Sequence, residues 1–291
     1  MLLGALEGGG TKMVCAIGEE DGSVIDRISI PTKDPDETMP HIISYFKEKM
    51  VCALGIGFFG PLDLNPSSGT FGHLTATNKQ GWQNYDVMGV LKNALNVPCR
   101  IDTDVNAAAL GEAAYGCMRK LKNGIYITVG TGIGVGVIAN GSVVHGMVHP
   151  EGGHIIVRRH PDDHFPGDCD FHKDCLEGLA AGPAIEARMN CKGQDLPADS
   201  PVWGWISYYL AQAICDYIYI LSPEKIVLGG GVMKQTQLYP MIRQEVLRLL
   251  NDYVESDQIR DIDHYIVPAT LNDNQAVMGC LKLAYDAALL S

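Results

Sequence analysis

Residues 2–18 read LLGALEGGGTKMVCAIG, and they decide the fold because a glycine turn ending in Thr-Lys separates two apolar runs. The pattern predicts a strand, a tight turn and a second strand, then a Glu-Asp-Gly turn and a third strand over VIDRISIP. A Walker phosphate loop differs, because it leads from a strand into a helix and reads G-x-x-x-x-G-K-[ST]. The glycines would let backbone N–H groups approach an anion, with Thr11 and Lys12 adding a hydroxyl and a charge. An ordinary hairpin turn explains the glycines about as well.

The same arrangement recurs later in the chain. Residues 125–141, IYITVGTGIGVGVIANG, place a Gly/Thr turn between two apolar runs and end on an Asn-Gly turn. Residues 226–233, IVLGGGVM, predict a strand that runs into glycines just before a helix beginning near Gln235. Three glycine turns at strand ends, spread over both halves of the chain, indicate a nucleotide held between two related domains.

Length, composition and charge narrow the class of protein. A chain of 291 residues with 46% hydrophobic and 19% charged residues is typical of a globular protein of two domains. The 22 Lys and Arg against 34 Asp and Glu give a net charge of -12, which argues against nucleic acid and anionic membrane surfaces as partners. The start MLLGALEGGG does not show the basic region followed by a long apolar region that is typical of a signal peptide, and no stretch approaches the roughly 18 apolar residues of a membrane span. We therefore expect a cytoplasmic protein.

A polar loop contains a candidate metal site. Residues 154–175 read HIIVRRHPDDHFPGDCDFHKDC, in which Cys169, His172 and Cys175 have the spacing C-x-x-H-x-x-C. Two thiolates and an imidazole supply three of the four ligands of a tetrahedral zinc ion. A neighbouring histidine would supply the fourth, from among His149, His154, His160 and His164. The alternative is two free surface cysteines and a chance histidine.

A candidate catalytic carboxylate lies between the first two glycine turns. Residues 101–116, IDTDVNAAALGEAAYG, predict a short strand that ends in Asp102-Thr103-Asp104 and an Ala-rich helix with Gly116 near its end. Asp104 or Asn106 could simply be the N-cap of this helix. A carboxylate at a strand-to-helix junction is also where a general base for a sugar hydroxyl would lie.

The chain as a whole resembles the ROK sugar kinases, named for repressors, open reading frames and kinases. The resemblance covers residues 2–285. It rests on VGTGIGVGV, Gly146, PEGGH ending at His154, the three metal-motif residues and CLEGLAAGPAIEAR over residues 175–188. Within the family, EGGGTK, the insertion RRHPDDHFPGDC and DCLEGLAAGPAIEAR are most similar to bacterial ATP-dependent fructokinases.

The resemblance implies an α/β fold of two actin/hexokinase-like (ribonuclease H-like) domains with a cleft between them. Residues 1–105 plus 274–291 would form the smaller domain, and residues 106–273 the larger one that carries the zinc loop. The implied activity is transfer of a phosphoryl group from MgATP to the 6-hydroxyl of D-fructose, by a homodimer. The alternatives are another hexokinase of the family, a glucokinase or mannokinase, and a noncatalytic sugar-sensing ROK protein.

The resemblance also implies roles for particular residues. Asp104 would be the catalytic base, and the sugar would be contacted by Asn106, Glu151, His154 and Glu177. ATP would bind Gly9, Gly10, Thr11, Lys12, Thr131, Gly132, Pro183, Gly230, Gly231, Val232 and Met233, with Gly182 beside them.

The metal sites follow from the same resemblance. A closed structural zinc site would consist of His154, Cys169, His172 and Cys175, which leaves His149, His160 and His164 as ordinary loop histidines. His154 would then face both the metal and the sugar. Glu7 stands where many members have Asp, and its longer side chain leaves open whether it contacts Mg²⁺ directly or through water.

Overall fold

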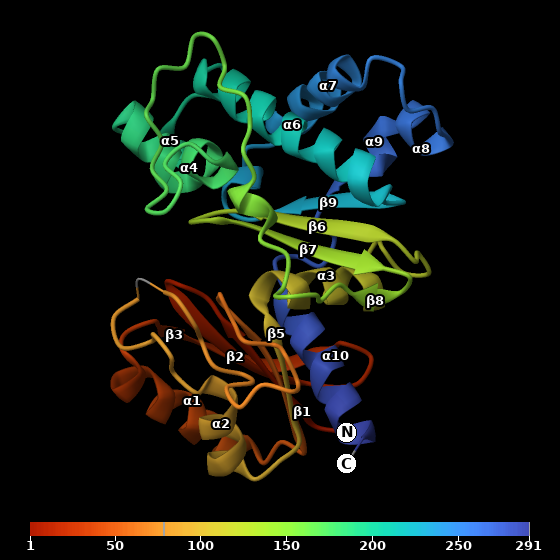
Figure 1. The fold of residues 1–291 in the computed structure, drawn as a ribbon. Helices are drawn as coiled ribbons and strands as arrows, with labels where there is room; N and C mark the ends of the chain where they lie inside the picture. The colour runs from red at the N-terminus through yellow and green to blue at the C-terminus, as the bar shows by residue number, and fades with distance from the viewer. Residues whose placement is uncertain (78, 291) are drawn as a thin grey trace. The chain divides into compact units, whose positions relative to one another are not determined.

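The computed structural model describes residues 1–77 and 79–290 of the chain. These residues form two compact units (Figure 1). The first consists of Met1–Lys120, Val143–Pro150 and the chain from Thr270 onward, and the second of Leu121–Ser142 and Glu151–Ala269. Neither unit is one continuous segment, because the chain passes between them several times.

A five-stranded mixed sheet with the strand order β3-β2-β1-β4-β5 forms the centre of the first unit. Its strands are β1 (Leu3–Gly8), β2 (Lys12–Gly18), β3 (Val24–Pro31), β4 (Ala53–Phe58) and β5 (Cys99–Thr103). The first three strands form an antiparallel meander, which confirms the hairpin predicted from residues 2–18. Strands β4 and β5 continue the sheet in parallel with β1. The carboxyl ends of β1, β4 and β5 therefore meet at one edge.

Helices cover both faces of this sheet. On one face, α1 (Pro35–Lys49) and α2 (Val87–Leu95) pack on apolar side chains such as Leu6 and Ile56. On the other face, α3 (Asp104–Ala114) and α10 (Gln275–Leu289) cover Leu3 and Ala5. Side chains alternate between the faces along β1, so one strand contributes to both cores.

Helices α3 and α10 approach each other closely because glycine lies at their crossing. A Cβ atom at Gly279 would lie 1.7 Å from the carbonyl oxygen of Ala107, so no larger residue fits there. We expected the first domain to reach residue 105, whereas the compact unit extends to Lys120. The packing of α3 on α10 explains why this helix belongs to the first unit.

The second unit repeats the strand order of the first. Its sheet has the order β10-β9-β6-β7-β8. The strands are β6 (Gly124–Val129), β7 (Ile133–Ala139), β8 (Ser142–Val143), β9 (Lys225–Gly229) and β10 (Ile266–Pro268). Strands β6 and β7 form the second predicted hairpin, and β9 and β10 extend the sheet in parallel with β6. The two sheets are thus built on one plan, as the expected fold class requires.

Helices of the second unit complete its core. They are α4 (Leu176–Ala180), α5 (Gly182–Met189), α6 (Val202–Leu221), α7 (Leu238–Leu250), α8 (Asp257–Arg260) and α9 (Ile262–Tyr265), with 3₁₀ turns at Gly152–His154, Gly193–Asp195 and Val232–Lys234. Helix α6 packs against α7 and α4. No helix in the described part of the chain is long and apolar enough to cross a membrane.

Candidate active site

Asp104 lies at the carboxyl edge of the first sheet, as the first residue of α3 after β5. Thr103 is the N-cap, because its side chain accepts a hydrogen bond from the backbone N–H of Asn106 at 3.1 Å. The alternative in which Asp104 or Asn106 caps the helix is therefore wrong. Asp104 Oδ1 accepts a hydrogen bond from the N–H of Val105 at 2.8 Å, and burial raises the pKa of this carboxyl to about 6.

Glu7, at the end of β1, is the second buried carboxyl group at this edge. Burial and, to a smaller extent, the negative charge of Asp104 raise its pKa to about 7, against the opposing effect of Lys12. A carboxyl with such a pKa is partly protonated at neutral pH, and a cation bound beside it would favour the ionised form.

The first glycine turn joins β1 to β2. The N–H of Gly9 donates to the carbonyl of Lys12 at 3.0 Å, and the hydroxyl of Thr32 donates to the carbonyl of Gly9 at 2.7 Å. Thr11 and Lys12 are exposed. A Cβ atom at Gly10 would lie 3.3 Å from Cε of Lys79, so a second lysine, which the sequence analysis did not single out, lies beside this turn.

Asp102 forms hydrogen bonds within the strand-to-helix junction that carries Asp104. Its Oδ1 accepts hydrogen bonds from the N–H of Thr103 at 2.8 Å and from Nδ2 of Asn106 at 2.7 Å. Its Oδ2 lies 2.9 Å from Nε2 of His145. Asn106 is only 1% exposed, so in this structure its amide supports Asp102 and offers little surface to a ligand. Sequence reasoning missed Asp102 and His145 as partners, since no periodicity relates residues so far apart.

The nucleotide residues predicted in the second unit converge at the carboxyl ends of β6 and β9. The turn Gly130–Thr131–Gly132 accepts a hydrogen bond from the N–H of Gly182 to the carbonyl of Gly130 at 2.8 Å. Pro183 follows in the first turn of α5. Gly230 and Gly231 end β9 and lead into the 3₁₀ turn that contains Val232 and Met233.

Glu177 lies against the same turn. Its Oε2 accepts a hydrogen bond from the N–H of Ile133 at 2.9 Å. A Cβ atom at Gly132 would lie 2.6 Å from this oxygen, so a side chain at this position would displace the carboxylate from its contact with Ile133. Of the other predicted sugar residues, Glu151 is exposed and its carbonyl accepts from the N–H of His154 at 3.0 Å.

The four predicted zinc ligands form one cluster. Ligand atoms of His154, Cys169, His172 and Cys175 all lie within 4.8 Å of one another. Nδ1 of His154 is 3.6 Å from Sγ of Cys175 and 3.8 Å from Sγ of Cys169. Bonds of about 2.0–2.3 Å in a tetrahedron place neighbouring donor atoms roughly 3.3–3.8 Å apart, so the side chains fit a zinc ion. None of His149, His160 and His164 belongs to this cluster.

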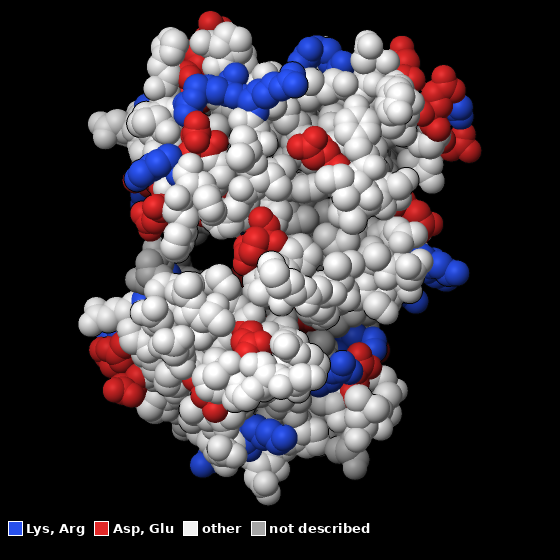
Figure 2. All heavy atoms as spheres, viewed as in Figure 1, with Lys and Arg blue, Asp and Glu red and all other residues white. Residues whose placement is uncertain are grey.

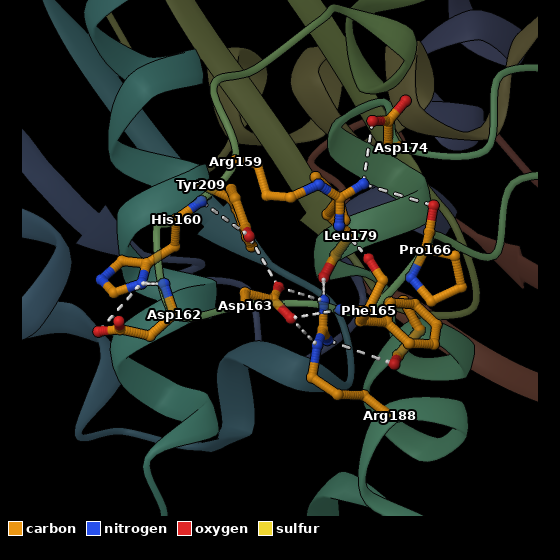
Figure 3. Close-up of polar contacts among 11 residues, drawn as sticks. Arg159, His160, Asp162, Asp163, Phe165, Pro166, Asp174, Leu179, Arg188 and Tyr209 are labelled. Atoms are coloured by element: carbon orange, nitrogen blue, oxygen red, sulfur yellow. Dashed lines mark hydrogen bonds and ion pairs between the residues drawn. The ribbon is translucent and has the colours of Figure 1, made fainter.

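A buried ion pair anchors the middle of the loop formed by residues 154–175, which carries the metal cluster (Figure 3). Arg188 of α5 donates from Nε and Nη2 to the carboxylate of Asp163 at 3.2 and 3.0 Å, and the hydroxyl of Tyr209 donates to the same carboxylate at 2.7 Å. Nη2 of Arg188 also donates to the carbonyl of Leu179 at 2.8 Å. The loop is therefore tied to α4, α5 and α6 independently of the metal cluster.

Charge on the surface is mixed. Figure 2 shows both acidic and basic side chains on one face of the molecule, with basic side chains gathered in a band across the upper part of the view. The net charge of -12 disfavours the approach of the protein as a whole to nucleic acid.

Comparison with known proteins agrees with this geometry. A family model described as ROK family matches residues 3–287. A putative fructokinase from Bacillus subtilis (strain 168) is 50% identical over 287 residues, which cover 98% of this chain and 96% of that protein. A fructokinase from Pediococcus pentosaceus is 48% identical, covering 99% of each chain. Among solved structures, a ROK hexokinase from Thermus thermophilus has a TM-score of 0.79 over 100% of both chains at 23% identity, a likeness of fold alone.

Proposed function

The chain belongs to the ROK family, and from that premise we propose that it is a fructokinase that phosphorylates D-fructose at the 6-hydroxyl with MgATP. The observation that carries the proposal is that the chain is 50% identical to a relative named putative fructokinase and 48% identical to one named fructokinase, over nearly the full length of each. The carboxyl edge of the first sheet supports the chemistry, because it offers a candidate base beside a glycine turn.

Asp104 acts as the general base. It accepts the proton of the 6-hydroxyl as the oxygen attacks the γ-phosphorus, and the bond from this phosphorus to the leaving oxygen of ADP breaks. Burial supports this role because it raises the pKa of Asp104 to about 6, close to the pH at which a base is most effective. The N-terminus of α3 keeps the carboxylate oriented through the N–H of Val105.

The glycine turns bind the phosphates through backbone N–H groups, aided by Lys12. When bound, Mg²⁺ neutralises charge on the phosphates, and the carboxylate oxygens of Glu7 are hard ligands suited to hold it or its waters. The carboxylate of Glu177 accepts a hydrogen bond from the N–H of Ile133 at the second glycine turn. This contact supports a role for Glu177 in positioning the turn, in addition to the expected sugar contact.

Zinc is structural in this proposal. His154, Cys169, His172 and Cys175 would hold it as four protein ligands, so it would fix the base of the loop and take no part in phosphoryl transfer. Homodimer formation and a cytoplasmic location complete the proposal. Light scattering of the purified protein tests the dimer, and a fluorescent fusion imaged in cells tests the location.

The proposal is tested by mixing purified protein with MgATP and each of fructose, glucose and mannose at equal concentration. ADP release measures turnover, and phosphorus NMR identifies the product. Fructose 6-phosphate with the highest kcat/KM for fructose is expected. A preference for glucose or mannose would point to the alternative hexokinases, and binding without ADP release would point to a sugar sensor.

A further inference from the structure

Asp102 and His145 form a pair that the proposed mechanism does not use. Nε2 of His145 lies 2.9 Å from Oδ2 of Asp102. The side chain of Asp102 is 6% exposed and that of His145 is 41% exposed, so a buried carboxylate holds a partly open imidazole. The pair lies entirely within the first unit, which includes residues 143–150.

The geometry determines which ring nitrogen is available. A carboxylate only accepts hydrogen bonds, so Nε2 of His145 carries the proton that it donates to Asp102. In the neutral ring, Nδ1 is then an acceptor, and it has no hydrogen-bond partner among the described residues. While the ring is neutral, Nδ1 is a free acceptor suited to receive a hydrogen bond from a hydroxyl group. The hydrogen bond to Asp102 raises the pKa of His145, so this acceptor is lost as the pH falls through that pKa.

The position of Asp102 in the first sheet places the pair near the residue proposed to deprotonate the sugar. Asp102 lies two residues before Asp104, at the carboxyl end of β5, where open α/β sheets bind their ligands. The same carboxylate binds Asn106, whose Oδ1 is buried without a partner in the described structure and is a second unsatisfied acceptor. The segment that carries His145 continues directly to Glu151, a residue expected to contact the sugar.

We propose that His145 is a hexose-binding residue whose Nδ1 accepts a hydrogen bond from a sugar hydroxyl, with Asp102 fixing the ring. This inference rests on the proposed function, since the ligand is the hexose that Asp104 deprotonates. The competing explanation is that His145 merely supports Asp102 and the junction that carries Asp104.

Two isosteric variants separate these explanations. In His145→Gln, the terminal amide nitrogen takes the place of Nε2 and still donates to Asp102, while nothing occupies the place of Nδ1. In His145→Asn, the amide takes the place of Nδ1 and does not reach Asp102. The matched control is His264→Gln, because His264 forms an exposed pair with Asp261 at 2.7 Å in the second unit.

The measurements are KM and kcat for fructose and ATP, the dissociation constant of fructose by calorimetry, and the melting temperature. His145→Gln should raise the fructose KM and dissociation constant roughly five- to tenfold, the loss expected for one hydrogen bond. Its ATP KM should stay within twofold, and its melting temperature should match that of wild type. His145→Asn should also weaken fructose binding, and it should lower the melting temperature because Asp102 loses its partner.

Deoxy analogues of fructose extend the test. The ratio of KM between His145→Gln and wild type should fall to about one for the analogue that lacks the contacted hydroxyl. If His145→Gln binds fructose within twofold of wild type, His145 only supports Asp102 and the inference is overturned. If wild type binds fructose without turnover, the proposed function fails but the calorimetric comparison still tests His145. If wild type binds no hexose, both fail.

Discussion

Removal of the Asp163 carboxylate should destabilise the second unit strongly. The side chains of Arg188 and Asp163 are 5% and 1% exposed, so Asp163→Ala leaves a guanidinium buried without its counter-charge. The carboxylate also accepts from the hydroxyl of Tyr209 at 2.7 Å and the N–H of Phe165 at 3.1 Å. Loss of one partner of a buried pair costs about 3–5 kcal/mol. For a unit of this size, that free energy corresponds to a fall of roughly 10 °C in melting temperature.

Calorimetry of the zinc-loaded protein measures this effect. The control is Asp257→Ala, which removes the exposed pair of Arg260 with Asp257, whose side chains are 65% and 96% exposed. Such a pair contributes at most about 1 kcal/mol, so the control should melt within a few degrees of wild type. A melting temperature for Asp163→Ala equal to that of the control would refute the reasoning that the buried pair holds the loop.

The same pair predicts how stability depends on pH. Burial raises the pKa of Asp163, but hydrogen bonds from Tyr209 and Arg188 outweigh it and hold the pKa below its usual value. A carboxyl with a lowered pKa in the folded state contributes stability above its unfolded pKa, about 3.9, and loses it as pH falls through the folded value. The difference in melting temperature between wild type and Asp163→Ala should therefore shrink in acid. A difference that grows in acid would contradict this sign.

Four further predictions concern the proposed activity and the metal site. Asp104→Asn should fold and bind fructose but lose about 10²- to 10⁴-fold in kcat, because only the proton acceptor is removed; near wild-type turnover would exclude Asp104 as the base. The rate kcat/KM should fall as pH drops through about 6 to 7, since Asp104 and Glu7 have raised pKa values of about 6 and about 7 and act in ionised form; a flat profile from pH 5 to 8 would contradict this. Metal analysis should find about one zinc per chain, and Cys175→Ser should lower zinc content and melting temperature together. Removal of zinc with a chelator should raise the fructose KM while ATP binding stays within a few-fold of its starting value. Loss of ATP affinity with unchanged fructose affinity would show that the loop beginning at His154 does not shape the sugar site.

Local patterns were sufficient for the two hairpins and for three of the four residues of the metal cluster. The two hairpins follow from apolar runs on either side of Gly/Thr turns, since a turn between adjacent strands is a short-range feature. The metal cluster could be predicted because Cys169, His172 and Cys175 lie within one loop, where spacing alone limits how the side chains can converge. The resemblance to a family then supplied His154 as the fourth ligand.

Tertiary structure alone decided which distant residues meet. Asp102 pairs with His145 although 43 residues separate them, and Asp163 pairs with Arg188 and Tyr209 from two different helices. It also decided that Thr103 caps α3, that Asn106 is buried and donates to Asp102, and that α3 packs on α10 within the first unit. The physical reason is that periodicity and turn chemistry act over a few residues, whereas burial and pairing of charged groups depend on which surfaces the folded chain brings together.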